Sequence, residues 1–365
     1  MHVAIDARMA FSAGIGRCVR SLVPRLARAE PAWRFTLLGD RSRMERADWA
    51  ALSNAAFVDC RAPVYGLREQ WQLVTRTPSD ADVFWAPHYN VPVLGRKPLV
   101  TTVHDVAHLR LPEFTRNPAR RAYARTLFAV ASARSAEILC DSEFSRSEFE
   151  SLVGLRARRP IVVHNGIDEF WFDDAPTPRP VADRYFVFVG GSRPHKNLGG
   201  LVRALAMLTD LPGANLIVVG SLDSARTRDS TVAGLVESLD GRVRNVGDIQ
   251  DELLRAYIRH AEALIMPSFY EGFGFPPLEA MAAGTPAIVS RAGSLPEVCG
   301  DAALYCDPSD PADMAQRMRE IWQSPDLKRA MAVRGRTQAR RYRWDESATA
   351  LRDALVRATQ PAAHA

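Results

Sequence analysis

The feature that most constrains the fold is a regular alternation of short apolar segments with helical patterns along the whole sequence. The apolar segments are rich in β-branched residues, which is typical of buried strands in βαβ units. In the first half they lie at 2–5, 34–39, 83–86, 98–105, 137–142 and 160–166. In the second half they lie at 185–191, 215–221, 243–247, 263–268, 286–290 and 303–307. The pattern predicts an α/β protein with two doubly wound parallel sheets.

A chain of 365 residues is long enough for about two domains, each with its own core. The best candidate boundary is APTPRPVA at 175–182, because three prolines in eight residues cannot continue a helix or a central strand. The predicted parts are an N-terminal domain at 1–175, a linker at 176–182, a C-terminal domain at 183–343 and a last helical segment at 344–365. Ligands of such sheets bind at the carboxyl ends of the strands, and we expect them there and in a cleft between the domains.

Composition excludes several classes of protein. With 47% hydrophobic and 24% charged residues the chain is globular, and no segment is apolar enough to span a bilayer. The start has no signal-peptide pattern, so we expect a cytoplasmic protein. The five cysteines never form a CxxC pair, and we expect buried thiols instead of a disulfide framework or zinc site. The histidines form no HExxH motif, so no metal held by the protein is expected.

The net charge of +5 comes from the first half, and one local source is the segment 110–134, with six arginines and several apolar residues. This segment could be a helix that touches anionic lipid headgroups at the inner membrane, through Arg116, Arg120 and Arg121. The alternative is an ordinary surface helix that packs by its apolar stripe. Nucleic acid is not an expected partner, because the basic residues are not interleaved with stacking aromatic side chains.

The sharpest motif is PSFYEGFGFPPLEAMAAGTPAIVS at 267–290, a glycine-rich loop between an apolar segment and a helix expected to start near Pro277. Gly272 and Gly274 allow close approach of the backbone, and free N–H groups at a helix start favour phosphate. Glu279 would lie in the first turn of that helix, and Glu271 lies eight positions earlier. Because carboxylates accept hydrogen bonds from sugar hydroxyls, the pair fits the ribose and the hexose of a nucleotide sugar. The alternatives without a ligand are that Glu279 is an acid that stabilises the helix N-terminus and that Glu271 is a solvated loop acid.

Three further segments follow apolar runs and end in polar or glycine residues. VGGSRPHKNL at 189–198 places Arg193, His195 and Lys196 where cations would match a diphosphate. SAGIGRCVRSL at 12–22 is a partial glycine-rich match, for which a simple tight turn is the alternative. In TTVHDVAHL at 101–109, the expected strand ends with His104 and Asp105, which would point into the cleft unless His104 is a core histidine.

Taken together, GIGR, VHD, CDSEFSR, VVHNGID, VGGSRPHKN, EGFGFPPLE and GTP occur in an order that resembles family 4 of retaining glycosyltransferases. The resemblance runs from about residue 3 to about residue 345, and FGFPPLEAMAAGTP is its most specific part. It implies the GT-B fold, in which two Rossmann-like domains face each other across a cleft and a last helix returns to the first domain. The branch that looks most similar comprises bacterial O-antigen and exopolysaccharide mannosyl- and rhamnosyltransferases.

The resemblance also implies roles for particular residues. The implied catalytic residues are His104, Lys196 and Glu271. The donor-binding residues would be Gly16, Arg193, Lys196, Gly272, Phe273, Gly274, Phe275, Leu278 and Glu279. Gly14 and Asp105 would lie on the acceptor side. One departure is Gly191, where many members carry an arginine, so Arg193 could supply that charge by another route.

The implied activity is transfer of a hexose, with mannose from GDP-mannose as the preferred donor, onto a glycan or a polyprenyl-linked saccharide. Retention would proceed by front-face attack without a metal ion or other cofactor, because no DxD motif follows an expected strand. A polyprenyl-linked acceptor would bring the protein to the inner leaflet as a peripheral protein of lipopolysaccharide or exopolysaccharide synthesis.

Other functions remain open at this point. A dTDP-rhamnose or UDP-sugar donor is possible, and a nucleotide-sugar 2-epimerase shares the architecture but needs no acceptor. A glycosidase also uses two carboxylates but needs them on opposite sides of one bond. A binding protein without turnover would keep the phosphate loop.

Overall fold

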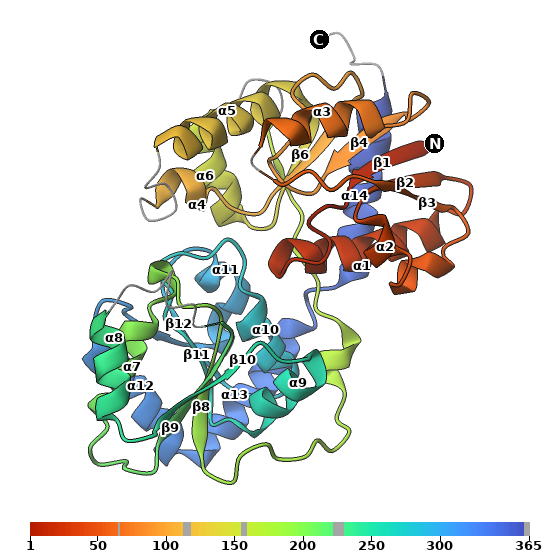
Figure 1. Cartoon of the computed structure of the whole chain (residues 1–365). Coiled ribbons are helices and arrows are strands. Elements are labelled where there is room, and N and C mark those ends of the chain that lie inside the picture. The colour runs from red at the N-terminus through yellow and green to blue at the C-terminus, as the bar shows by residue number, and fades with distance from the viewer. Residues whose placement is uncertain (65, 112–117, 155–158, 222–229, 361–365) are drawn as a thin grey trace. The chain divides into compact units, whose positions relative to one another are not determined.

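The computed structural model describes residues 1–64, 66–111, 118–154, 159–221 and 230–360, and the chain divides into two compact units (Figure 1). Unit 1 comprises Met1–Gly166 and Arg343–Ala365, and unit 2 comprises Ile167–Tyr342. The chain therefore leaves unit 1 after Gly166 and returns to it at Arg343. Each unit contains one parallel sheet, as the alternating pattern predicted.

Unit 1 has a 7-stranded sheet in the order β3-β2-β1-β4-β5-β6-β7. Its strands are β1 (His2–Asp6), β2 (Arg34–Gly39), β3 (Ala55–Asp59), β4 (Val83–Ala86), β5 (Leu99–Val103), β6 (Ser135–Cys140) and β7 (Ile161–Val162). Only β3 was not predicted. It is an edge strand with partly exposed side chains, and its sequence opens with two alanines, which are depleted in strands.

The helices of unit 1 connect these strands. They are α1 (Gly14–Ala29), α2 (Arg41–Met44), η1 (Asp48–Ala51), α3 (Leu67–Arg76), α4 (Ala107–Arg110), α5 (Pro118–Arg134), α6 (Glu143–Val153) and α14 (Trp344–Thr359). The last of these comes from the end of the chain and contacts α1, β4, β5 and β6. It therefore supplies part of the cover of a sheet whose strands were formed by the first half of the chain.

Unit 2 has a 6-stranded parallel sheet in the order β10-β9-β8-β11-β12-β13. Its strands are β8 (Tyr185–Val189), β9 (Asn215–Val219), β10 (Val243–Gly247), β11 (Leu264–Met266), β12 (Ala287–Ser290) and β13 (Leu304–Cys306). Its helices are η3 (Glu169–Phe172), η4 (Pro194–Lys196), α7 (Leu198–Ala206), α8 (Ser230–Ser238), α9 (Asp251–His260), α10 (Phe275–Ala282), α11 (Leu295–Cys299), η5 (Gly300–Ala302), α12 (Pro311–Gln323) and α13 (Pro325–Ala339).

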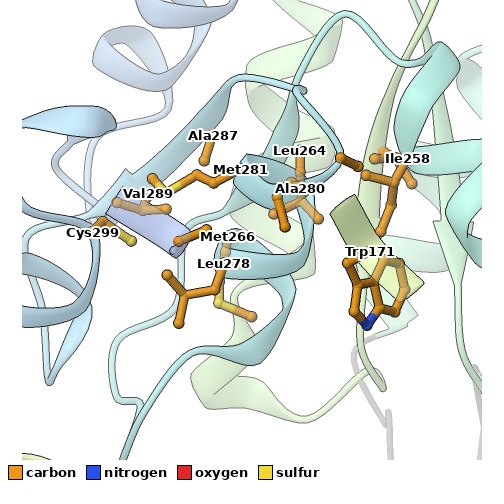
Figure 2. Packing of buried hydrophobic residues seen from close by; sticks show 14 of the residues in the cluster. Trp171, Ile258, Leu264, Met266, Leu278, Ala280, Met281, Ala287, Val289 and Cys299 are labelled. Carbon is orange, nitrogen blue, oxygen red and sulfur yellow. The ribbon is translucent and has the colours of Figure 1, made fainter. Parts of the chain in front are cut away.

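The central strands β8, β11 and β12 of the unit 2 sheet are buried on both faces, which explains why they are almost entirely apolar. Along β8, Tyr185 and Val187 belong to one buried cluster, and Phe186 and Phe188 belong to the other. Figure 2 shows part of the first cluster, where side chains of α10, β11 and β12 pack beside Trp171 and Cys299. Loops at the strand ends are thereby fixed to a rigid two-sided core.

The predicted linker is not the boundary between the units. The crossover lies at Gly166–Ile167, and 175–182 belongs to unit 2. Arg259 of α9 donates hydrogen bonds to the carbonyl oxygens of Asp173 and Ala175, at 2.7 and 2.9 Å. His260 also bonds the Thr177 carbonyl, at 2.9 Å. The three closely spaced prolines disfavour a helix or strand, so this segment runs along unit 2 without regular secondary structure and does not separate two cores.

The two crossovers between the units lie side by side. The Ile167 N–H donates to the Tyr342 carbonyl at 2.9 Å, and Ser347 Oγ donates to the His164 carbonyl at 2.6 Å. Gly166 approaches the start of α14 so closely that an added Cβ would lie 2.1 Å from the backbone nitrogen of Trp344. Only glycine fits at this position, because the opposing atoms are backbone and cannot rotate away.

The basic segment 110–134 is only partly described. Arg116 and the side chain of Arg120 lie outside the described residues. On α5, Arg121 and Arg125 are exposed, whereas Leu127 and Phe128 are buried in the core. The described part thus has the arrangement of a surface helix that packs by its apolar stripe.

The five cysteine side chains are buried, in agreement with the expectation of buried thiols. Among the described residues, no helix has both the length and the apolar character needed to cross a membrane. Within the same residues, no three His, Cys, Asp or Glu side chains gather in a way that could hold a metal ion.

The crossover generates a stability prediction. Gly166→Ala should lower the free energy of unfolding by about 3 kcal/mol, because its Cβ must displace the backbone of α14. Gly213→Ala is the matched control, since nothing lies within 4 Å of its added Cβ, and it should change stability by less than about 1 kcal/mol. Urea unfolding followed by circular dichroism measures both. Equal stability of the two variants would contradict the close approach.

Candidate functional site

The candidate site in unit 2 is centred on an ion pair between Lys196 and Glu271. Lys196 Nζ lies 2.6 and 2.8 Å from the two carboxylate oxygens of Glu271. Their side chains are 21% and 11% exposed, so both charged groups remain reachable by a ligand. Lys196 ends η4, after β8, and Glu271 lies in the loop between β11 and α10. Neighbouring parallel strands thus bring together two motifs that are 75 residues apart in the sequence.

Asn197 holds the loop of Lys196 in place. It adopts a left-handed conformation with φ 56° and caps α7 by accepting a hydrogen bond from the Gly200 N–H. Its side-chain amide donates to the carbonyl oxygens of Pro267 and Pro308, at 3.1 and 2.6 Å. This buried side chain therefore ties together the loops that follow β8, β11 and β13. The sequence analysis assigned it no role, although an asparagine directly before a helical pattern is a capping signal.

The loop of Glu271 is held from the other side by the segment after β12. Ser294 donates hydrogen bonds from its N–H and its Oγ to the Glu271 carbonyl, both at 3.1 Å. Gly293 adopts φ 62°, and an added Cβ would lie 2.5 Å from that carbonyl oxygen. The Phe269 N–H also donates to the His195 carbonyl at 2.7 Å. Backbone bonds thus fix the acid and its cation before any ligand binds, which is the preorganisation that electrostatic catalysis needs.

Helix α10 begins earlier than predicted, at Phe275 instead of near Pro277. Gly274, at φ 116°, is its N-cap, and the prolines lie in the first turn, where the missing N–H groups are not needed. Glu279 consequently lies beyond the first turn, which corrects the expected position and removes the explanation of this residue as an N-terminal acid. Its side chain is 1% exposed, so it is not a solvated surface charge either.

The side chains of the other predicted donor-binding residues in this loop and in α10 pack into the core. The Phe273 ring is buried and packs edge to face against the rings of Phe275 and Tyr342, with 5.2 and 5.7 Å between ring centroids. Leu278 is fully buried in the core shown in Figure 2. These side chains anchor the loop in the hydrophobic core, whereas Gly272 and Glu271 remain partly exposed.

The loop after β8 carries the other predicted cation. Arg193 is exposed and is the N-cap of η4. At Gly191, the nearest atom to an added Cβ would be the Ser221 carbonyl oxygen, at 3.7 Å, so a side chain would fit there. His195 is 7% exposed, and its burial, together with the charge of Lys196, lowers its pKa to about 4. It is therefore a neutral ring at neutral pH and adds no charge to the loop.

In unit 1, His104 lies at the carboxyl end of β5. Its Nδ1 lies 2.6 Å from Asp141 Oδ2, and its Nε2 lies 2.8 Å from the Pro87 carbonyl. Burial opposes protonation, but the Asp141 carboxylate and both hydrogen bonds raise the pKa of His104 above its usual value. A ring with an acceptor on each nitrogen is satisfied when both nitrogens carry a proton. The geometry therefore favours the protonated form of His104.

Asp105 follows β5 directly after His104, whereas Gly14 and Gly16 belong to α1, which follows β1. Asp105 Oδ1 accepts a hydrogen bond from the Ala107 N–H at 2.8 Å, so it shapes the turn into α4. Gly14 is the first residue of α1 and is exposed. Gly16 packs so tightly that an added Cβ would lie 2.6 Å from the Ala10 carbonyl oxygen. The short glycine motif thus permits close packing of α1 on the preceding loop.

A buried ionic network that the sequence analysis missed lies after β1. Arg8 donates to Asp6 at 2.7 Å and to Glu69 of α3 at 2.9 Å. Glu69, which is fully buried, also accepts from Asn90 at 3.0 Å and from Tyr123 at 2.5 Å. Its partners are up to 61 residues away, so no local pattern reveals it. The network joins four segments at the same edge of the sheet as His104.

Comparisons with protein families cover almost the whole chain. Residues 12–169 match the model of Glycosyltransferase Family 4, and residues 169–338 match the model of Glycosyl transferases group 1. The junction between the two matches falls within three residues of the crossover at Gly166–Ile167.

Among curated proteins, the O-antigen chain mannosyltransferase B of Escherichia coli is 30% identical over 301 residues, which are 79% of this chain and 75% of that protein. The O-antigen chain mannosyltransferase RfbU of Salmonella typhimurium is 29% identical, over 66% of this chain and 64% of that protein.

Solved structures share the fold at lower identity. Sucrose-phosphate synthase from Thermosynechococcus elongatus matches with a TM-score of 0.77 and 19% identity, over 97% of this chain and 98% of that chain. Anabaena HepE in complex with UDP-glucose matches with a TM-score of 0.79 and 17% identity, over 98% and 99%.

The depressed pKa of His195 generates a pH prediction. The unfolded chain binds a proton near pH 6.5, whereas the folded chain resists it down to about pH 4, so acid favours unfolding in this window. From about pH 7.5 to about pH 5, the wild type should lose about 2 kcal/mol of stability relative to His195→Gln, which has no such group. Urea unfolding of both proteins at the two pH values measures the difference, and a pH-independent difference would contradict the buried neutral ring.

Proposed function

The chain belongs to glycosyltransferase family 4 and has the GT-B fold, and we propose from this premise that it is a retaining hexosyltransferase that builds a cell-surface polysaccharide. The observation that carries the proposal is the preorganised pair of Lys196 and Glu271 beside the glycine-capped start of α10. A cation, an acid and an open loop of backbone N–H groups form a binding surface for a diphosphate joined to a sugar.

Lys196 takes the main electrostatic role in the proposed reaction. As the bond between the anomeric carbon and the diphosphate breaks, negative charge grows on the leaving phosphate. Lys196 would stabilise that charge together with the backbone of the loop before α10, with Arg193 as a second cation. We propose that these groups suffice without a metal ion.

Glu271 and Glu279 would divide the sugar contacts. Glu271, in the loop and partly exposed, would accept hydrogen bonds from hydroxyl groups of the transferred hexose. Glu279, buried on α10, would bind the ribose. With Glu271 already bonded to Lys196, binding of the sugar and neutralisation of the phosphate are coupled through one ion pair.

His104 would not act as the base of this reaction. Both of its ring nitrogens bond acceptors inside unit 1, so the ring has no lone pair available for the acceptor hydroxyl. We propose front-face attack, in which the leaving phosphate accepts that proton and the attacking oxygen arrives on the same side of the sugar. A protonated ring cannot stabilise positive charge on the sugar, so His104 would do this through its backbone carbonyl oxygen or would hold the strand end in place.

For the donor we propose GDP-mannose, and for the acceptor a glycan or a polyprenyl-linked saccharide. The names of the Escherichia coli and Salmonella relatives support mannose and O-antigen synthesis. A UDP-sugar is the alternative donor, supported by the UDP-glucose complex of Anabaena HepE. A 2-epimerase remains a second candidate, and it would convert a donor without any acceptor.

The test is release of free nucleotide by the purified protein from GDP-mannose, GDP-fucose, dTDP-rhamnose, UDP-glucose and UDP-N-acetylglucosamine, each with and without EDTA. We expect slow release from GDP-mannose that EDTA does not change. Activity that disappears in EDTA and returns with manganese would overturn the metal-free mechanism. Formation of an epimerised nucleotide sugar in place of free nucleotide would favour the isomerase.

The ion pair generates a variant prediction. Lys196→Ala should lower kcat/KM by about 10²- to 10³-fold, because the leaving phosphate loses its cation. Lys328→Ala is the matched control, since Lys328 also pairs with a largely buried acid of unit 2, Glu262, at 2.9 Å. It breaks a similar ion pair away from the loop and should leave kcat/KM unchanged. A similar loss in both variants would assign the effect to stability of unit 2 instead of to catalysis.

A further inference from the structure

Unit 1 has a groove on the opposite edge of its sheet from His104. It is a cavity of about 240 Å³ lined by the end of α3, the residues 92–97, the first residue of β5 and the last residue of α5. Leu73, Phe84 and Leu99 form an apolar floor. In Figure 1, α3 and α5 can be located by their labels in the orange and yellow part of the chain. No step of the proposed transferase mechanism uses this edge of the sheet.

Large apolar side chains stand exposed around the groove. Trp71 is 64% exposed, Val74 is 36% exposed and Leu94 is 78% exposed. Trp71 and Val74 are three positions apart on α3, so they lie on the same side of the helix. Single exposed apolar residues are normal on a protein surface, but Val74 and Leu94 both line this groove, and Trp71 extends the apolar surface along the same side of α3.

Leu94 is presented by a loop that is held firmly in place. The guanidinium of Arg134 donates hydrogen bonds to the carbonyl oxygens of Pro92, Val93 and Gly95, the first at 2.9 Å. Lys97 Nζ also donates to the Ser79 carbonyl at 2.6 Å. The exposed leucine is therefore the fixed tip of a loop whose backbone is bonded on both sides, and its exposure does not result from a loose segment.

The groove is also positively charged. Its lining includes Arg96, Lys97 and Arg134 and, among the residues that the structure describes, no acidic side chain. Lys97 and Arg134 bond backbone carbonyls, so no carboxylate cancels their charge in these contacts. An occupant must therefore offer both apolar groups and negative charge. A neutral apolar peptide would leave the positive charge of the groove unbalanced.

We propose that Trp71, Val74, Leu94, Arg96, Lys97 and Arg134, the apolar-cationic surface, bind the face of a bilayer that contains anionic phospholipids. Tryptophan prefers the headgroup boundary, leucine and valine bury in the outer acyl region, and arginine and lysine bond phosphates. The surface shares only Arg134 with the basic segment 110–134 described above. The proposal goes beyond the transferase function, because it concerns binding and needs no sugar transfer.

The test is sedimentation of the full-length protein with large vesicles of phosphatidylcholine alone or mixed with phosphatidylglycerol. We expect binding to the anionic vesicles only, weakened by added salt because the cations contribute to it. The double variant Trp71→Glu with Leu94→Glu should bind anionic vesicles at least about tenfold more weakly than the wild type. Arg96→Glu should also weaken binding, although all apolar groups remain. Circular dichroism checks that each variant is folded.

The matched control is Met207→Glu with Val333→Glu, which replaces two exposed apolar residues of unit 2, 49% and 69% exposed, by the same acid. This control should bind vesicles as the wild type does. Absence of vesicle binding, equal binding to neutral vesicles, or equal loss in the control would overturn the proposal. A concentration-dependent dimer that Leu94→Glu dissociates would overturn it in favour of a second copy of the chain as the occupant.

Discussion

Burial of a parallel sheet on both faces is the constraint from which the rest of the molecule follows. Alternate side chains of β8 enter two separate cores, so neither face of the sheet is available to a ligand. Polar and flexible residues can then lie only at the strand ends, and parallel strands place one set of ends at one edge. Lys196 and Glu271 follow β8 and β11, neighbours in the sheet, which is why they meet.

Hydrogen bonds to backbone carbonyl oxygens hold the loops of the candidate site, and with them its few charged side chains, in fixed positions. Asn197 ties three loops together through two carbonyl oxygens, and Ser294 holds the carbonyl of Glu271. Such a site loses little entropy when a charged ligand arrives, because its groups are already oriented. Unit 1 follows the same rule, since His104 and Asp141 hold each other at adjacent strand ends.

The features that could be predicted from sequence are those with a local signal. Strands with β-branched and other large apolar residues were found, whereas β3 was missed because it opens with two alanines, which are depleted in strands. The loop motifs were recognised by their glycine spacing, but the start of α10 was misplaced because its N-cap is a glycine at φ 116° instead of a polar residue. Asn197 and Glu69 act through partners 70 or 61 residues away, and such contacts exist only after folding. Prolines at 175–182 indicated a break in secondary structure and not a boundary between cores.

The paired crossovers at Gly166 and Arg343 make unit 2 an uninterrupted insertion within unit 1. During synthesis on the ribosome, all strands and helices of unit 2 emerge before α14 does, so unit 2 can complete its core while unit 1 still waits for its last helix. Until then the faces of α1 and β6 that α14 covers stay open to solvent. Unit 1 is therefore completed only when α14, made after all of unit 2, docks onto strands made before it, and translation that stops before α14 would leave a finished unit 2 and an incomplete unit 1.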